Sequence, residues 1–430
     1  MDLDALTRAL ADGDEAEFAH LLCFVPDDEL AGPRGTELLE TAARAGRAEA
    51  VEELVLLRGV DVSRPWTDGV DAVGWAAERG LVDVLRSLLS GTGKGLVLHR
   101  RALRAARAAL AADPTGPEAR RAVISMLEFD LGLFRSPDGL MARALVHADP
   151  DHPDWDEALL VLARRADREL VDWACARVLD APSLAARRFA LDALFYLGLG
   201  INFLDDGDEG NGGPDFTHAA VVFLRPLLDI EQDPYALKTV LYALREHCWR
   251  DHRATLPHLG HVDATVRSAA VNAAAGALLP PTTEWDQELV AALLHRAEDQ
   301  DPTVRRVTAE VFVNALAHRD DVDPRILAAV LHLADDPAPD VRAAATHALY
   351  RSRQDTPALR AVLTRRLDDS GVVIDIRIQA AGALAARGDQ RGRAFLDGIS
   401  RGLTSYRSPG QGAMGDVWHM IRTYGVPNGW

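Results

Sequence analysis

Apolar residues recur along most of the chain with the spacing of helices that bury one face. Between residues 41 and 55, for example, Val51, Leu54 and Val55 fall on one side of a predicted helix, because residues three and four apart are neighbours on a helical surface. Similar short segments, rich in Ala and Leu, follow one another to about residue 400. The pattern predicts an all-α protein built from many short helices.

The first ninety residues contain three copies of one pattern. Equivalent Ala, Gly and Leu positions recur 33 and then 34 residues apart. The shared glycines are Gly13, Gly46 and Gly80. Each is expected to end a helix in the left-handed conformation, which glycine adopts without a steric penalty. Each copy therefore predicts a helix, a glycine turn and a second helix, with Gly59 and Gly69 in a connecting segment.

These copies resemble the ankyrin repeat, whose pattern runs Ala-Ala-x-x-Gly and then Val-x-x-Leu-Leu. The family's Thr-Pro-Leu-His start is missing, and the middle copy has Thr36-Glu37-Leu38-Leu39 in its place. That departure puts the hairpin-like turn of the family in question but not the helices. The resemblance implies ankyrin-like repeats over residues 1–92.

From about residue 113, turns marked by Asp or Pro precede a Val-Arg or similar step and an Ala-rich helix. Asp accepts hydrogen bonds from free N–H groups at a helix start, and Pro fits the first turn. The clearest steps, 38, 37 and 35 residues apart, contain Arg267, Arg305, Arg342 and Arg377. Each arginine can pair with an Asp of the neighbouring repeat, so we expect a ladder of ion pairs.

This signature is similar to that of short HEAT repeats of the phycobilin-lyase type. The resemblance implies an α-solenoid over residues 93–405, with an acidic insertion at 200–215. Residues 406–430 leave the pattern, and a helix around Gly412 to Tyr424 is expected to cap the last repeat, which otherwise exposes apolar surface. The predicted fold is an all-α solenoid of helix pairs, ankyrin-like and then HEAT-like.

The chain is strongly acidic, with a formal net charge of −18. This disfavours nucleic acid and anionic lipid as partners and favours basic ones. No run of 18 apolar residues occurs, so no membrane span is expected. The acidic start lacks the features of a signal peptide, and the three cysteines are far apart. We therefore expect a cytoplasmic protein, and the scarcity of lysine favours a GC-rich bacterial source.

The acidic insertion is the first candidate site. Its carboxylates lie among glycines and are Asp205, Asp206, Asp208, Glu209 and Asp215. Their oxygens could hold a divalent cation, although the spacing of an EF-hand is not met. A partner-binding loop and a solvated insertion are the alternatives.

A second candidate is a group of potential metal ligands that includes His247, Cys248 and His252. Zinc prefers such side chains, but their spacing matches no zinc finger. The alternative is a helix end at which histidine interacts with the helix dipole.

A third candidate is the basic segment from residue 98. Arg100, Arg104 and Arg107 share one face of the predicted helix. They could contact an anion or an acidic partner, or they could form a solvated face.

Residues 398–402 match the Gly-x-Ser-x-Gly motif of a nucleophile elbow as a string, but the segment before them is predicted to be a helix and not the required strand. No motif therefore identifies an enzyme. The sequence favours a scaffold or regulatory module that binds a protein or peptide on the concave face of the solenoid, without a cofactor. The alternative is an enzyme built on HEAT-like repeats, either peptide-modifying or similar to alkylpurine DNA glycosylases, with its site on the concave face or at the insertion. The net charge disfavours the glycosylase. A regulator that sequesters a basic target is the third hypothesis.

Overall fold

A computed structural model describes the chain except for residues 1–2, 67–68, 91–95, 117, 166, 205–214, 248–250, 280–284, 403–410 and 425–430. All regular secondary structure in these described parts is helical. The helices form two compact units, Met1–Phe216 and Thr217–Trp430. The predicted all-α solenoid of helix pairs is confirmed within each unit.

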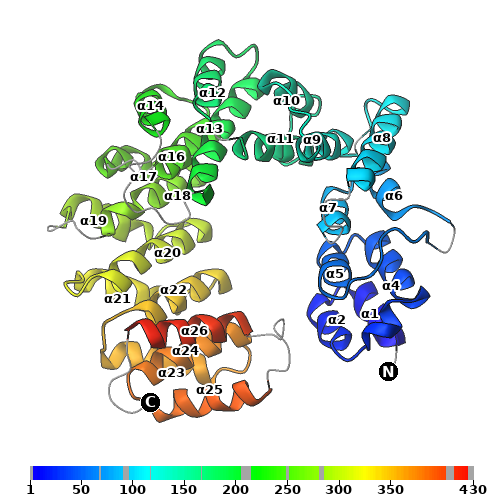
Figure 1. The fold of residues 1–430 in the computed structure, drawn as a ribbon. Coiled ribbons are helices and arrows are strands. Elements are labelled where there is room, and N and C mark those ends of the chain that lie inside the picture. Colours follow the sequence, from blue (N-terminus) through cyan, green and yellow to red (C-terminus); the bar gives the residue numbers. More distant parts are fainter. Residues whose placement is uncertain are drawn as a thin grey trace. The chain divides into compact units, whose positions relative to one another are not determined.

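The first unit is a succession of short helices (Figure 1). They are α1 (Leu3–Asp12), α2 (Glu15–Leu22), α3 (Asp27–Leu30), α4 (Pro33–Arg44), α5 (Ala48–Glu52) continued by the π-helical turn η1 (Glu53–Leu57), α6 (Ala72–Glu78), α7 (Val82–Ser90), α8 (Leu96–Ala112), α9 (Arg120–Asp130), α10 (Pro137–Ala144), α11 (Pro153–Ala163), α12 (Arg168–Asp180) and α13 (Leu184–Leu204).

Three glycine turns have the predicted conformation. Gly13, Gly46 and Gly80 have φ angles of 74°, 71° and 68° and separate α1 from α2, α4 from α5 and α6 from α7. Only Gly80 of the three lies against other backbone, because a Cβ there would sit 2.5 Å from the amide nitrogen of Ala119. This turn therefore fixes the approach of α6 and α7 to the start of α9.

The core of the first unit is continuous from repeat to repeat. One cluster of buried apolar side chains runs from Leu6 to Leu127. Beyond it, α9, α11 and α13 pack in succession, with α10 against α11 and α12 against α13. Small core residues such as Ala42, Ala76 and Ala122 are fully buried, which lets neighbouring helices approach closely.

The second unit continues the pattern of short helices. They are α14 (Asp215–Leu224), α15 (Leu227–Ile230), α16 (Pro234–Glu246), the 3₁₀ turn η2 (His252–Thr255), α17 (Leu256–Leu259), α18 (Ala264–Ala273), the 3₁₀ turn η3 (Ala274–Leu278), α19 (Gln287–Arg296), α20 (Pro302–His318), α21 (Pro324–Leu333), α22 (Pro339–Arg351), α23 (Pro357–Asp368), α24 (Ile374–Ala386), α25 (Gln390–Gly402) and α26 (Gln411–Tyr424).

The helices of the second unit form two layers (Figure 1). In one layer α16, α18, α20, α22 and α24 pack in sequence, and in the other α17, α19, α21 and α23 do. Helix starts follow the predicted rule: Asp263 accepts a hydrogen bond from the amide of Thr265 at 2.8 Å, and Asp301 accepts one from Thr303 at 2.7 Å. The acidic turns thus satisfy the free N–H groups of successive repeats.

The arginine ladder is present for two rungs. Arg267 donates from Nε and Nη2 to Asp299, at 2.9 and 2.7 Å, and Arg305 does the same to Asp336, at 2.7 and 2.9 Å. The guanidinium of Arg305 holds the pKa of Asp336 below its usual value. These bidentate pairs fix the register of one repeat on the next.

The ladder ends at Arg342. Its Nη1 donates to the carbonyls of Asp336 and Pro337, at 2.8 and 2.9 Å, but makes no bond to a carboxylate of the next repeat among the described contacts. The position equivalent to Asp336 in that repeat is Gly371, so the acceptor is missing. Arg377 instead donates to the carbonyl of Leu367 at 3.1 Å.

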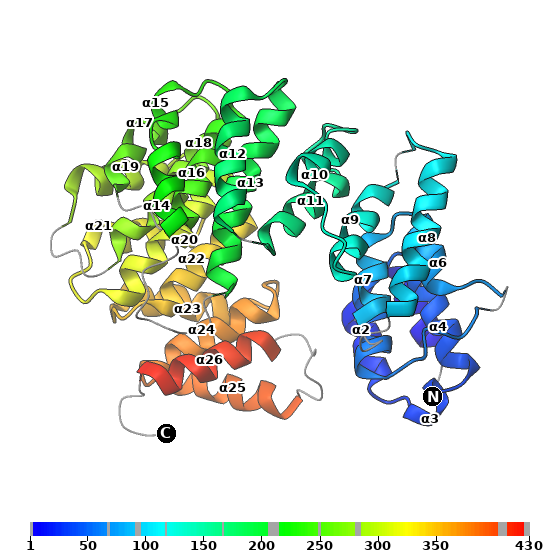
Figure 2. The ribbon, with the colours of Figure 1, turned by 45° about the horizontal axis from the view of Figure 1, so that its top comes forward.

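The predicted C-terminal helix is confirmed as α26. It packs against α24, which also contacts α25 (Figure 2). Val417 is fully buried, and its side chain covers Gly382, where a Cβ would lie 2.7 Å away. Met414 is also buried. The helix therefore covers apolar surface at the last repeat.

Candidate functional site

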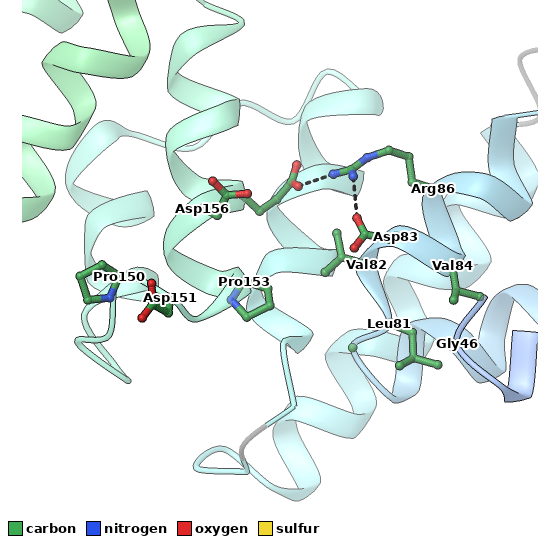
Figure 3. A pocket seen from close by; sticks show the side chains of 12 residues that line it. Gly46, Leu81, Val82, Asp83, Val84, Arg86, Pro150, Asp151, Pro153 and Asp156 are labelled. Atoms are coloured by element: carbon green, nitrogen blue, oxygen red, sulfur yellow. Dashed lines mark hydrogen bonds and ion pairs between the residues drawn. The ribbon is translucent and has the colours of Figure 1, made fainter. Parts of the chain in front are cut away.

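A cavity in the first unit lies between the start of α7 and the start of α11. Its volume is about 470 Å³, within the ordinary range of ligand pockets. Figure 3 shows Asp83 and Arg86 on α7 opposite Pro153 and Asp156 on α11. The lining residues are Gly46, Gly80, Leu81, Val82, Asp83, Val84, Arg86, Pro150, Asp151, Pro153, Asp156 and Glu157.

Negative charge dominates this cavity. Four carboxylates and one guanidinium line it, so its formal charge is −3 when all are ionised. Asp83, Asp151 and Asp156 are exposed. Arg86 donates to Asp83 at 2.9 Å and to Oε2 of Glu157 at 2.6 Å. One internal arginine therefore leaves most of the negative charge unneutralised.

Glu157 is the unusual acid of this group. It is 2% exposed, and its Oε1 has no hydrogen-bond partner. Burial raises the pKa of Glu157 to about 7, because desolvation of the carboxylate outweighs the attraction of Arg86. The Glu157 side chain therefore gains or loses its charge close to neutral pH, and a nearby cation favours the charged form.

Asp156 is held by a tyrosine from the next helix pair. The hydroxyl of Tyr196 on α13 donates to Oδ1 of Asp156. Burial, together with this bond, raises the pKa of Tyr196 well above its usual value. Tyr196 therefore remains a neutral donor that orients the Asp156 carboxylate at the cavity.

We expect the stability of the first unit to fall as pH rises from about 5 to 8. Folded Glu157 keeps its proton up to about pH 7, whereas the ordinary value is 4.5. Between these values the folded state binds more protons, so rising pH destabilises it, by about 2–3 kcal/mol in total.

Thermal unfolding of the wild type and of Glu157→Gln across this pH range measures the effect. The difference between the two curves isolates Glu157 from other titrating groups. Equal pH slopes in both proteins would show that Glu157 is not the responsible group.

The predicted acidic loop lies largely outside the described residues. Asp205, Asp206, Asp208 and Glu209 fall in the range 205–214. Asp215 is the first residue of α14. The prediction of a cation or partner site there stays a prediction.

The predicted histidine and cysteine group is described only in part. His247 follows α16 and is buried, and Cys248 lies outside the described residues. Nδ1 of His252 lies 3.2 Å from the carbonyl oxygen of Ala273, which ties this ring to α18. Metal binding by this group also stays a prediction.

The predicted arginine face belongs to α8. Arg100 and Arg104 are exposed, and Arg104 donates to the carbonyl of Arg100 at 3.3 Å. Arg107 donates to Glu128 at 2.7 Å, and this buried carboxylate also pairs with Arg143 at 2.8 Å. One of the three arginines is therefore part of an internal ion cluster.

The cavity was not found from the sequence because its two walls are distant along the chain. Arg86 and Glu157, which are hydrogen-bonded, are 71 residues apart. The local signal was the segment HADPDHPDWDE from residue 147, in which acids and histidines crowd around prolines before a helix. That density is a sign of a structured polar turn.

No protein-family model matches the chain, and no curated protein matches its sequence. Among solved structures, the X-ray structure of YibA from Escherichia coli is similar with a TM-score of 0.44 and 15% sequence identity, over 67% of this chain and 93% of YibA. A match this distant carries no argument about activity. The stacked helices described above define a helical-repeat protein. None of the helices in the described ranges is long and apolar enough to cross a bilayer.

Proposed function

We propose that this chain is a protein-binding scaffold and that its cavity receives a basic side chain of a protein or peptide partner. The observation that best supports this proposal is the excess of carboxylates around one cavity, among them the buried Glu157. Helical repeats often present such surfaces to other proteins, and the acidic chain favours a basic partner.

The residues that line the cavity suit a lysine or arginine side chain. Such a side chain has an apolar stem and a charged head. Leu81, Val82 and Pro153 offer apolar contacts for the stem, while Asp83 and Asp156 offer carboxylates for the head. A bound cation would also favour the ionised form of Glu157, so binding is expected to tighten as pH rises through 7.

The repeat types are part of the proposal. The left-handed glycines Gly13, Gly46 and Gly80 support ankyrin-like repeats over residues 1–92. The ion pairs of Arg267 and Arg305 support HEAT-like repeats within residues 93–405. In this arrangement the cavity lies where the two repeat types follow one another along the chain.

Selection of peptides from a random displayed library against the intact chain tests the function. We expect the selected peptides to share a lysine or arginine at one position and to be displaced by free basic peptide. Their binding should be weaker at high salt than at low salt. Selection of acidic or purely apolar peptides, or of none, would contradict the proposal.

A further inference from the structure

We propose that His147, His152 and Asp154 form a binding site for a divalent transition-metal ion such as Zn²⁺. They lie in and just after the turn between α10 and α11, in the first unit. Among the described residues they are the group of three potential ligands whose atoms all lie within 4.8 Å of one another. Two imidazoles and a carboxylate, with a position open to water, are a ligand set that zinc accepts.

The distances between the ligand atoms are slightly longer than those around a bound ion. Nε2 of His147 lies 3.6 Å from Oδ2 of Asp154, and Nδ1 of His152 lies 3.8 Å from the same oxygen. Ligands about 2.0–2.1 Å from a tetrahedral ion are roughly 3.3 Å apart. Small side-chain movements therefore bring the ligand atoms to the required separation.

The buried carboxylate points to a missing ligand. Asp154 is 1% exposed, and its Oδ1 accepts the amide hydrogen of Ala122 at 2.7 Å. Its Oδ2 accepts no hydrogen bond, and Nε2 of His147, which faces it, has no hydrogen-bond partner. Buried polar atoms are normally partnered, and one cation between these two atoms would satisfy both.

The two histidine rings are held side by side. The rings of His147 and His152 stack, with centroids 4.0 Å apart and planes inclined by 23°. Between them Ala148 has a φ of 52°, the one left-handed non-glycine residue in the described chain. The turn thus holds both rings beside Asp154.

Two neighbouring groups, the amide of Asp154 and the guanidinium of Arg121, oppose metal binding. Nδ1 of His152 accepts the amide hydrogen of Asp154 at 3.1 Å, so this ring must give up that bond or turn to present Nε2. Nη1 of Arg121 lies 3.8 Å from Oδ2 of Asp154, and its positive charge opposes a cation. The site therefore needs a metal that forms strong bonds to imidazole and is not expected to retain Mg²⁺ or Ca²⁺.

Titration of the intact, chelator-treated chain with Co²⁺ and then Zn²⁺ tests the site. We expect a single Co²⁺ per chain with the visible absorption of a low-coordinate ion, which Zn²⁺ then displaces. His147→Ala and Asp154→Asn should each weaken Zn²⁺ binding by at least about 100-fold, beyond the loss expected from an outer-shell partner.

The matched control is His99→Ala in the same unit. Nε2 of His99 lies 3.9 Å from Oδ2 of Asp130, but this pair is not part of a three-ligand group among the described residues. The control should bind Zn²⁺ like the wild type. Circular dichroism of each variant shows whether it is folded, and His147→Ala, which removes a partly exposed side chain, is the variant least expected to disturb folding.

The proposal is overturned by a chain that binds no Co²⁺ or Zn²⁺, by unchanged affinity in folded His147→Ala, or by an equal loss in His99→Ala. Loss of binding in His252→Ala, with none in His147→Ala, would place the metal at the predicted group around Cys248 and overturn it too. Failure here would leave the peptide-binding proposal intact, because the peptide selection needs no metal.

Discussion

Arg305→Ala is expected to destabilise the second unit by about 3–5 kcal/mol, the range for removal of one partner of a buried ion pair. Side chains of Arg305 and Asp336 are 14% and 7% exposed. The substitution leaves the Asp336 carboxylate without its bidentate donor. It also removes the bonds from Nη1 to the carbonyls of Asp299 and Gln300, at 2.8 and 3.1 Å.

Hydrogen exchange of α20 and α22, together with the melting temperature, measures this loss. Arg306→Ala is the matched control, because the adjacent Arg306 is 37% exposed and pairs with Glu310 one turn along the same helix. Such surface pairs contribute about 0.3–0.5 kcal/mol. If the two variants were destabilised equally, the pair between repeats would not be what stabilises their register.

Gly80→Ala is expected to destabilise the first unit by about 3 kcal/mol or more. A left-handed φ alone costs an alanine about 1 kcal/mol. At Gly80 the added Cβ would also lie 2.5 Å from the nitrogen and 2.8 Å from the carbonyl carbon of Ala119, and backbone cannot turn aside as a side chain can. The start of α9 must therefore shift.

Gly46→Ala provides the control for this prediction. Gly46 has the same repeat position and a similar φ of 71°, but no atom lies within 4 Å of the Cβ that alanine would add. The Gly46→Ala variant should lose only the stability that a left-handed φ costs an alanine, about 1 kcal/mol. Thermal melts and hydrogen exchange in α6 and α9 separate the two variants, and equal losses would rule out the contact with Ala119 as the cause.

The sequence predicted those parts of the fold that repeat. Each glycine turn, Asp cap and Val-Arg step is encoded within a few residues, so its recurrence reveals a helix pair without knowledge of its neighbours. The rung from Arg305 to Asp336 was predictable for the same reason. The expected ladder was too long, because it included Arg342 and Arg377. An Asp lies six residues before Arg305 and before Arg342, whereas Gly371 occupies this position before Arg377.

The candidate sites could not be predicted in the same way. The cavity joins Arg86 to Glu157 across 71 residues, and they come together because α7 and α11 both pack against α9. Burial raises the pKa of Glu157 and of Asp154, and it too depends on helices that pack against α11 from elsewhere in the chain. The candidate sites predicted from the sequence were instead acids and histidines that lie close together along the chain, such as Asp205 to Glu209.

The most direct test of the proposed function is the affinity of a selected basic peptide for matched charge variants, measured by calorimetry at constant salt. One variant combines Asp83→Asn, Asp151→Asn and Asp156→Asn. The control carries Asp12→Asn, Asp28→Asn and Glu37→Gln, three exposed acids of the same unit that do not line the cavity. Both lose the same net charge. We expect binding to weaken at least about tenfold, or 1.4 kcal/mol, in the first variant only. Equal affinity of the two variants would contradict a role for the cavity.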